Sequence, residues 1–349
     1  MSVSARLIAI LLVVVLTVVS ALIVLRDSAS DPSPPSAPRA AATSALYLSD
    51  DTLARLDFNS GTARPIGRTP TTDVYASESS PWIAYVVAGD GAQGGEDFLA
   101  EPVLRTINTA TEASTEIGPG FNPLWHPTDT RLAFLRPIVR RQCSGERCEG
   151  LFEIVVYDAE SRNSTVLTEP GRFNLLAWSG DRVLAADKSD LAVSLSLGSK
   201  DDVQRLDLEP SHLWDASPDG RWLLRSAPDG AALVDLDSER ERALSIGQGV
   251  LADGAWSPDS KHIVAGLLNE ARTKTRALLI DIPSGKVREI TDELPGILGV
   301  TWTPDARQFG FLTFVDRSDR TELNVCSSAD LRCEVVGPPL RRAILLRLE

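Results

Sequence analysis

A short turn motif recurs along this chain and constrains its fold more than any other feature. Its clearest copies are Trp256-Ser-Pro-Asp259, Trp302-Thr-Pro-Asp305 and Ser217-Pro-Asp-Gly220. Proline presets the backbone of a tight turn, and aspartate and glycine suit the positions that follow. Because strand-like residues flank each copy, the motif predicts a strand, a tight turn and a second strand, repeated along the chain.

Six copies of this motif turn align on its serine position, roughly 40–50 residues apart, which is the repeat length of a propeller blade. The serine position is occupied by Ser77, His126, Ser179, Ser217, Ser257 and Thr303. Tryptophan precedes it in four copies, and Ala76 and Ala216 precede it in the other two. The residues assigned to the motif, with a structural role, are Trp125, Trp178, Ser217, Pro218, Asp219, Gly220, Trp256, Ser257, Pro258, Asp259, Trp302, Pro304 and Asp305.

A second repeating element, a strand pair around a polar turn, follows each copy. Its copies align at Asp57, Asn108, Asp158, Ser196, Asp235, Asp281 and Asn324. No motif turn precedes the copy at Asp57, and the chain ends in a strand-like run at 341–349. The pattern predicts an all-β propeller of seven four-stranded blades, with six as the alternative. The carboxy-terminal strand is expected to close the ring by pairing with amino-terminal strands.

The repeated Ser-Pro-Asp turns resemble the WD40-like PD40 repeat over residues 45–349. That repeat occurs in TolB-like propellers and in the propellers of prolyl-oligopeptidase-type peptidases, so the resemblance implies a propeller fold. TolB carries an α/β domain before its propeller, whereas an apolar run and a spacer stand there in this chain. A TolB role in outer-membrane linkage is therefore not carried over.

The amino-terminal region predicts a membrane anchor. Residues 7–25 contain no charge, and 19 helical residues would span about 28 Å, close to the ~30 Å hydrocarbon core of a bilayer. We expect a short cytoplasmic stretch at 1–6, a transmembrane signal-anchor at 7–25, a flexible Pro/Ser/Ala-rich linker at 26–44 and the propeller at 45–349. The alternative is a cleaved signal peptide and a secreted propeller.

The four cysteines form two close pairs, Cys143/Cys148 and Cys326/Cys333. Local pairing predicts two disulfides and hence an extracytoplasmic, oxidising location for the propeller. A zinc site would call for C-x2-C spacing and histidine partners. Neither accompanies these cysteines, so no metal or cofactor is predicted.

The net charge and the sequence motifs disfavour several classes of partner and of catalytic site. The net charge of −13 disfavours nucleic acid as a partner. No G-x-S-x-G nucleophile elbow occurs. Of the three histidines, His126 and His262 are expected to be solvated turn residues, whereas His212 is a candidate for facing the channel. The aspartates of the turns are expected to cap their own amides rather than to bind calcium.

These patterns predict a membrane-anchored, extracytoplasmic, non-enzymatic propeller that acts as a binding or scaffolding module. Its partner would be a protein, a peptide or a glycan. The alternative is a propeller enzyme of lyase or lactonase type with a site at the channel mouth. We expect a ligand to be held by residues that differ between the repeats rather than by those they share.

Overall fold

The computed structural model describes residues 41–69, 71, 73–87, 102–144, 147–186, 192–197, 202–206, 213–227, 230–315 and 319–349. The side chains of 139–144, 147–150, 192, 213, 214, 227 and 253 lie outside that description. The compact unit is Ala42–Glu349. Within the described residues, no helix combines the length and the apolar character needed to cross a membrane. The predicted segments 1–6, 7–25 and most of 26–44 lie outside them.

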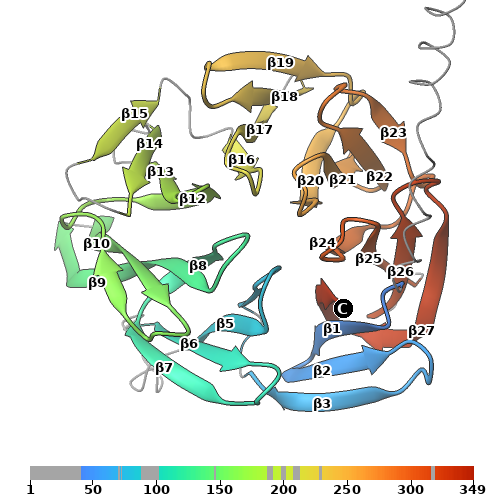
Figure 1. Ribbon diagram of the computed structural model, residues 1–349, viewed down its shortest axis with the longest axis horizontal. Coiled ribbons are helices and arrows are strands. Elements are labelled where there is room, and N and C mark those ends of the chain that lie inside the picture. Colours follow the sequence, from blue (N-terminus) through green and yellow to red (C-terminus); the bar gives the residue numbers. More distant parts are fainter. Residues whose placement is uncertain are drawn as a thin grey trace, which may run out of the picture. The chain divides into compact units, whose positions relative to one another are not determined.

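The described strands form seven four-stranded antiparallel sheets arranged as blades around a common centre (Figure 1). From the centre outward, blade 1 consists of β28 (Ala343–Leu348), β1 (Ser44–Ser49), β2 (Thr52–Asp57) and β3 (Ala63–Arg68), and blade 2 consists of β4 (Val74–Ala76), β5 (Trp82–Val87), β6 (Val103–Asn108) and β7 (Ser114–Pro119). Blade 3 consists of β8 (Phe121–Trp125), β9 (Arg131–Ser144), β10 (Arg147–Asp158) and β11 (Ser164–Val166). Blade 4 consists of β12 (Asn174–Ser179), β13 (Arg182–Ala186), β14 (Ala192–Ser196) and β15 (Val203–Leu206).

The remaining three blades follow the same plan. Blade 5 consists of β16 (Leu213–Ala216), β17 (Trp222–Ala227), β18 (Gly230–Asp235) and β19 (Arg240–Leu244). Blade 6 consists of β20 (Val250–Trp256), β21 (His262–Leu268), β22 (Thr275–Asp281) and β23 (Val287–Glu289). Blade 7 consists of β24 (Ile297–Trp302), β25 (Gln308–Phe314), β26 (Arg320–Ser327) and β27 (Cys333–Arg341). The predicted propeller of seven blades is thus confirmed, and the alternative of six is wrong.

Blade 1 closes the ring with strands from both ends of the unit. β28 pairs with β1 in antiparallel register, from Ala45 opposite Leu348 to Ser49 opposite Ala343. The buried guanidinium of Arg347 donates to the carbonyl of Ser77 in the motif turn of blade 2, at 3.2 Å. The predicted closure by the carboxy-terminal strand is therefore confirmed. It leaves β1 paired on both sides, with β28 and with β2, so that β1 is not an open edge strand.

The motif turn joins the innermost strand of blades 2 to 7 to the second strand. In blade 5 the Ser217 hydroxyl donates to Asp219 at 2.5 Å and accepts from the Trp222 amide at 2.9 Å. The Ser257 hydroxyl in blade 6 makes the same pair of bonds, at 2.6 and 2.9 Å. These aspartates bond within their own turns, as the sequence predicted.

The tryptophan of the motif connects neighbouring blades. Trp178 is buried, and its indole N–H donates to the carbonyl of Leu124 in the preceding blade at 2.9 Å. Trp125 and Trp302 donate in the same way to Tyr75 and Ala255, at 2.8 and 3.0 Å. Between the blades these indoles pack with aliphatic clusters that draw residues from two adjacent sheets. The packing role predicted for the tryptophans therefore includes a hydrogen bond between blades.

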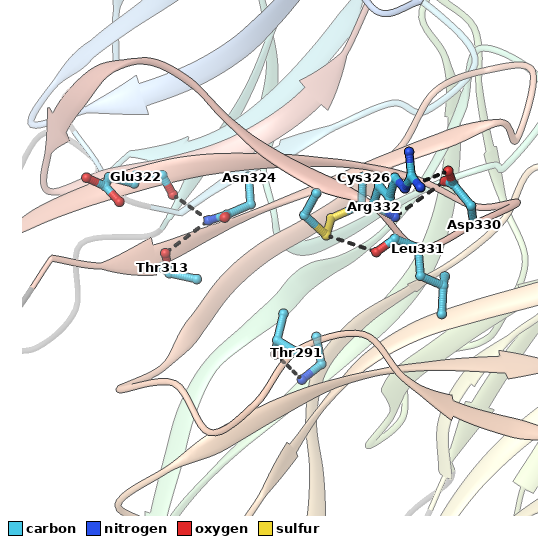
Figure 2. Close-up of a disulfide and its surroundings, with 10 residues drawn as sticks. Thr291, Thr313, Glu322, Asn324, Cys326, Asp330, Leu331 and Arg332 are labelled. Atoms are coloured by element: carbon cyan, nitrogen blue, oxygen red, sulfur yellow. Dashed lines mark hydrogen bonds and ion pairs between the residues drawn. A yellow bond between two sulfur atoms is a disulfide. The ribbon is translucent and has the colours of Figure 1, made fainter.

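In the outer hairpin of blade 7, the structure corrects the alignment of the second repeating element at Asn324. Ser327, not Asn324, is equivalent to Asp281. The amide of each donates to the carbonyl five residues later in the chain, and the carbonyl of each accepts from the amide four residues later. Asn324 lies inside β26, where its side-chain amide donates to Thr313 at 3.0 Å (Figure 2). Serine in place of the usual aspartate hid this hairpin from the sequence alignment.

A disulfide joins Cys326 and Cys333 across this hairpin, as predicted (Figure 2). The backbones of Cys143 and Cys148 lie opposite each other in the hairpin of β9 and β10. Their side chains lie outside the described residues, so the second disulfide stays a prediction.

Candidate ligand site at the channel mouth

The innermost strands of all seven blades surround a cavity of about 400 Å³. Residues of the motif turns, Glu78, Pro127 and Pro218, also line it, so it lies at the end of the central channel where these turns gather. We call it the channel-mouth cavity. Its walls come from Val74–Ala76 of β4, Pro123–Trp125 of β8, Trp178 of β12, Asp215–Ala216 of β16, Trp256 of β20, Val300–Thr301 of β24 and Ile344–Leu346 of β28.

The channel-mouth cavity borders the two blades that lack the tryptophan of the motif. Ala76 in blade 2 and Ala216 in blade 5 occupy the tryptophan position, and both line the cavity. Where tryptophan is present, as at Trp178, the indole packs against the preceding blade. Trp125, Trp178 and Trp256 line the cavity as well. At the same motif position, Ala76 and Ala216 present a smaller side chain to it than an indole.

The same two blades supply the acidic side chains of the cavity. Glu78 occupies the position of the motif proline in blade 2, and Asp215 directly precedes Ala216 in blade 5. Burial, together with the nearby charge of Asp215, raises the pKa of Glu78 to about 7. Burial likewise raises the pKa of Asp215 to about 7, although the Ala216 amide donates to its carboxylate at 2.8 Å and opposes the shift. Both groups therefore change charge near neutral pH.

No cation balances these carboxylates among the described residues. None of the side chains that line the cavity belongs to lysine or arginine. The nearby Arg347 donates to the backbone carbonyls of Ser77 and Ser80. Its guanidinium forms its ion pair with Glu349, at 2.5 Å. The cavity is consequently negative when its carboxyl groups ionise.

His126 lines the cavity but is already engaged. Its ring is 4% exposed and packs edge-on against Trp178, with 4.8 Å between ring centroids. One ring nitrogen lies 3.0 Å from the carbonyl of Gly180, and the other lies 3.1 Å from Asp129. Burial lowers its pKa, opposed by the charge of Asp129. The prediction that His126 is a solvated turn residue is wrong, because the ring bridges two blades.

The other histidines do not add to this site within the described residues. The partly exposed ring of His262 stacks against Trp302 at 6.1 Å and lies 3.6 Å from Asp281, away from the residues that line the cavity. His212 lies outside the described part of the chain. The described residues also contain no group of three or more side chains placed to hold a metal ion.

Sequence reasoning did not single out Glu78 or Asp215. The available signal was indirect: Glu78 replaces a proline of the motif, and Ala76 and Ala216 replace its tryptophan. The residues of blade 2 and those of blade 5 lie well over a hundred positions apart along the chain. The repeat pattern does not reveal that both line the channel-mouth cavity.

Comparisons with known proteins show the fold. No family model and no curated protein matches this sequence. Among solved structures, TolB from Acinetobacter baumannii is 16% identical with a TM-score of 0.50, over 88% of this chain and 67% of that one. A prolyl endopeptidase is 13% identical with a TM-score of 0.60, over 89% of this chain and 50% of that one. A chain of the mitotic checkpoint complex is 12% identical with a TM-score of 0.52, over 88% and 86%.

These similarities show that the chain has a β-propeller fold like that of TolB. This chain spans half the length of the prolyl endopeptidase it matches. At such low identities the shared property is the fold alone. The neighbours include an enzyme as well as a component of a protein assembly.

Proposed function

We propose that this protein is a non-enzymatic, membrane-anchored propeller that binds a protein, peptide or glycan partner at its channel mouth, outside the cytoplasm. The observation that carries the proposal is the channel-mouth cavity, which Ala76 and Ala216 line at the position where other blades have the motif tryptophan. Concave sites with apolar walls and a few polar groups are typical of ligand pockets. The mitotic checkpoint complex offers a precedent for a similar propeller within a protein assembly.

The proposed location is supported by the apolar segment 7–25 and by the disulfide between Cys326 and Cys333, since disulfides persist in oxidising compartments. Non-reducing peptide mapping of the protein isolated from its native membranes should find both Cys326–Cys333 and Cys143–Cys148. Free thiols at all four positions would contradict an extracytoplasmic propeller.

Refilling the cavity tests the binding role. Ala76→Trp combined with Ala216→Trp restores the motif residue in blades 2 and 5 and should abolish capture of partners from solubilised membranes. Val203→Trp is the matched control, because it adds the same indole on the outer strand β15, where Val203 is 47% exposed. Equal capture by the filled and the control variants would refute a partner site in the channel.

One observation favours a second candidate, an enzyme of lyase or lactonase type. Carboxyl groups whose pKa lies near 7 are suited to general acid–base catalysis, and Glu78 and Asp215 share a cavity. A panel of lactones and uronic-acid polysaccharides would test it. Turnover by the wild-type chain that Glu78→Gln or Asp215→Asn abolishes would favour the enzyme over the binding module.

A further inference from the structure

We propose that the channel-mouth cavity receives a basic side chain, lysine or arginine, of a peptide or protein partner, with the cation held between Glu78 and Asp215. This inference rests on the proposed binding function and names the chemistry of its ligand. It is argued from the walls of the cavity, from its uncompensated carboxylates and from the groups around them.

The two carboxylates lack a cationic partner. In the described part of the chain, Glu78 makes no hydrogen bond or ion pair, and the carboxylate of Asp215 accepts only the Ala216 amide. Both residues are partly buried, and a carboxylate withdrawn from water is costly unless it is paired. A cation that enters the cavity supplies this pair, and burial makes the attraction stronger than at an exposed surface.

The walls suit the stem of such a side chain. Val74, Leu124, Val300 and Leu345 contribute aliphatic surface to the same space. Lysine and arginine carry an alkyl stem that packs on apolar surface while the charged end reaches polar groups. The indoles of Trp178 and Trp256 also line the cavity, and indole faces attract ammonium and guanidinium groups. An apolar wall that ends at two carboxylates therefore complements a long basic side chain.

Binding should release protons, because a cation favours the ionised form of both carboxyl groups. Other ionisable groups near the cavity do not compete in the neutral range. Burial raises the already high pKa of Tyr75, aided by the charge of Asp73, and burial lowers the pKa of His126, which Asp129, Arg131 and Asp181 surround. Arg347 stays paired with Glu349. Affinity should thus rise with pH between 6 and 8, by up to about tenfold per unit for each proton released.

Calorimetric titration of the full chain in neutral detergent tests this inference. The probes are the N-acetyl methylamides of lysine, arginine and norleucine, the last being a neutral side chain of similar length. We expect saturable binding of lysine, arginine or both, at least about tenfold tighter at pH 8 than at pH 6, with proton release revealed by buffers of different ionisation enthalpy. The lysine and arginine arms distinguish ammonium from guanidinium.

Variants locate the site. Glu78→Gln and Asp215→Asn should each weaken binding of the basic probe at least about tenfold, because each removes one of the two charges, whereas Val203→Trp should not. Norleucine that binds as tightly as lysine and arginine, or basic probes that do not bind, would overturn the inference even if a variant failed to fold. A partner captured by the wild type and equally by the folded Glu78→Gln/Asp215→Asn double variant would overturn it and leave the proposed function standing.

Discussion

Blades 5 and 6 build the same turn and use it differently. Ser217 and Ser257 make matching hydrogen bonds to Asp219 and Asp259, at 2.5 and 2.6 Å. Immediately before the serine, however, blade 6 has the buried Trp256, whereas blade 5 has Ala216. The indole packs against residues of blade 5. Both residues line the channel-mouth cavity, and the alanine presents the smaller side chain to it.

Blade 2, like blade 5, lacks the tryptophan of the motif. It has Ala76 at the tryptophan position and Glu78 at the proline position, and both residues line the cavity. The comparison separates two kinds of residue in one repeat. Those that the blades share hold the ring together, and those that differ shape the site.

Removing residues 340–349 should destroy the ring. The truncation deletes β28 and Arg347, so blade 1 loses its innermost strand and its bond to the turn of blade 2. We expect the melting temperature to fall by roughly 10 °C or more, or the cooperative transition to disappear. Calorimetry on intact and truncated chains measures this. Identical melting curves would show that closure by β28 does not stabilise the propeller.

Trp178→Ala should cost about 3–5 kcal/mol of unfolding free energy. The indole is 4% exposed, and its N–H bonds to Leu124 in the neighbouring blade. Denaturant unfolding measures the loss. Trp178→Phe, which keeps much of the volume and removes the donor, is the matched control and should cost less. A loss below about 1 kcal/mol for alanine would mean that the shared tryptophan does not hold blades together.

Glu78→Gln and Asp215→Asn should stabilise the protein at pH 8. The pKa of each group is about 7 in the folded protein and near 4 when unfolded. Between pH 4 and 7 the folded state therefore binds more protons, and stability falls as pH rises through this range. The gain should be on the order of 2 kcal/mol per group at pH 8, discounted for partial exposure to water.

Unfolding at several pH values checks this prediction. The wild type should lose more stability than either variant between pH 5 and 8, and the variants should differ little from it at pH 4. Parallel stability curves for all three proteins would show that neither carboxylate is shielded from water.

Ser217→Ala and Ser257→Ala should cost the same, about 1 kcal/mol each. Each hydroxyl bonds to an aspartate and to a backbone amide of its own turn. Equal costs would confirm that blade 5 keeps the shared construction although its tryptophan is missing. A much smaller loss of unfolding free energy for Ser217→Ala would show that the turn of blade 5 does not share the stabilising role of the turn in blade 6.

The repeats explain how much of the fold could be predicted. Copies of one turn at regular spacing indicated the blades, and an unpaired terminal strand indicated the closure, because both are local or periodic signals. The burial of His126 was missed, since its contact with Gly180 comes from the next blade. The hairpin of blade 7 was misaligned because Ser327 stands where aspartate is usual.

For the candidate site, the sequence predicted only that a ligand would be held by residues that differ between the repeats. It did not predict which residues these are. Glu78 and Asp215 come from blades 2 and 5 and meet in one cavity only when the ring closes. Their raised pKa values depend on burial, which is a property of the assembled channel and not of either local sequence.

Titration of Glu78 and Asp215 shows whether the channel-mouth cavity withdraws two carboxyl groups from water. Side-chain ¹³C resonances of Glu78 and Asp215, assigned through Glu78→Gln and Asp215→Asn, are followed from pH 3 to 9. We predict that both carboxyl groups titrate with apparent pKa values of about 7, as a coupled pair. Titration of both groups near pH 4, like exposed carboxylates, would contradict it.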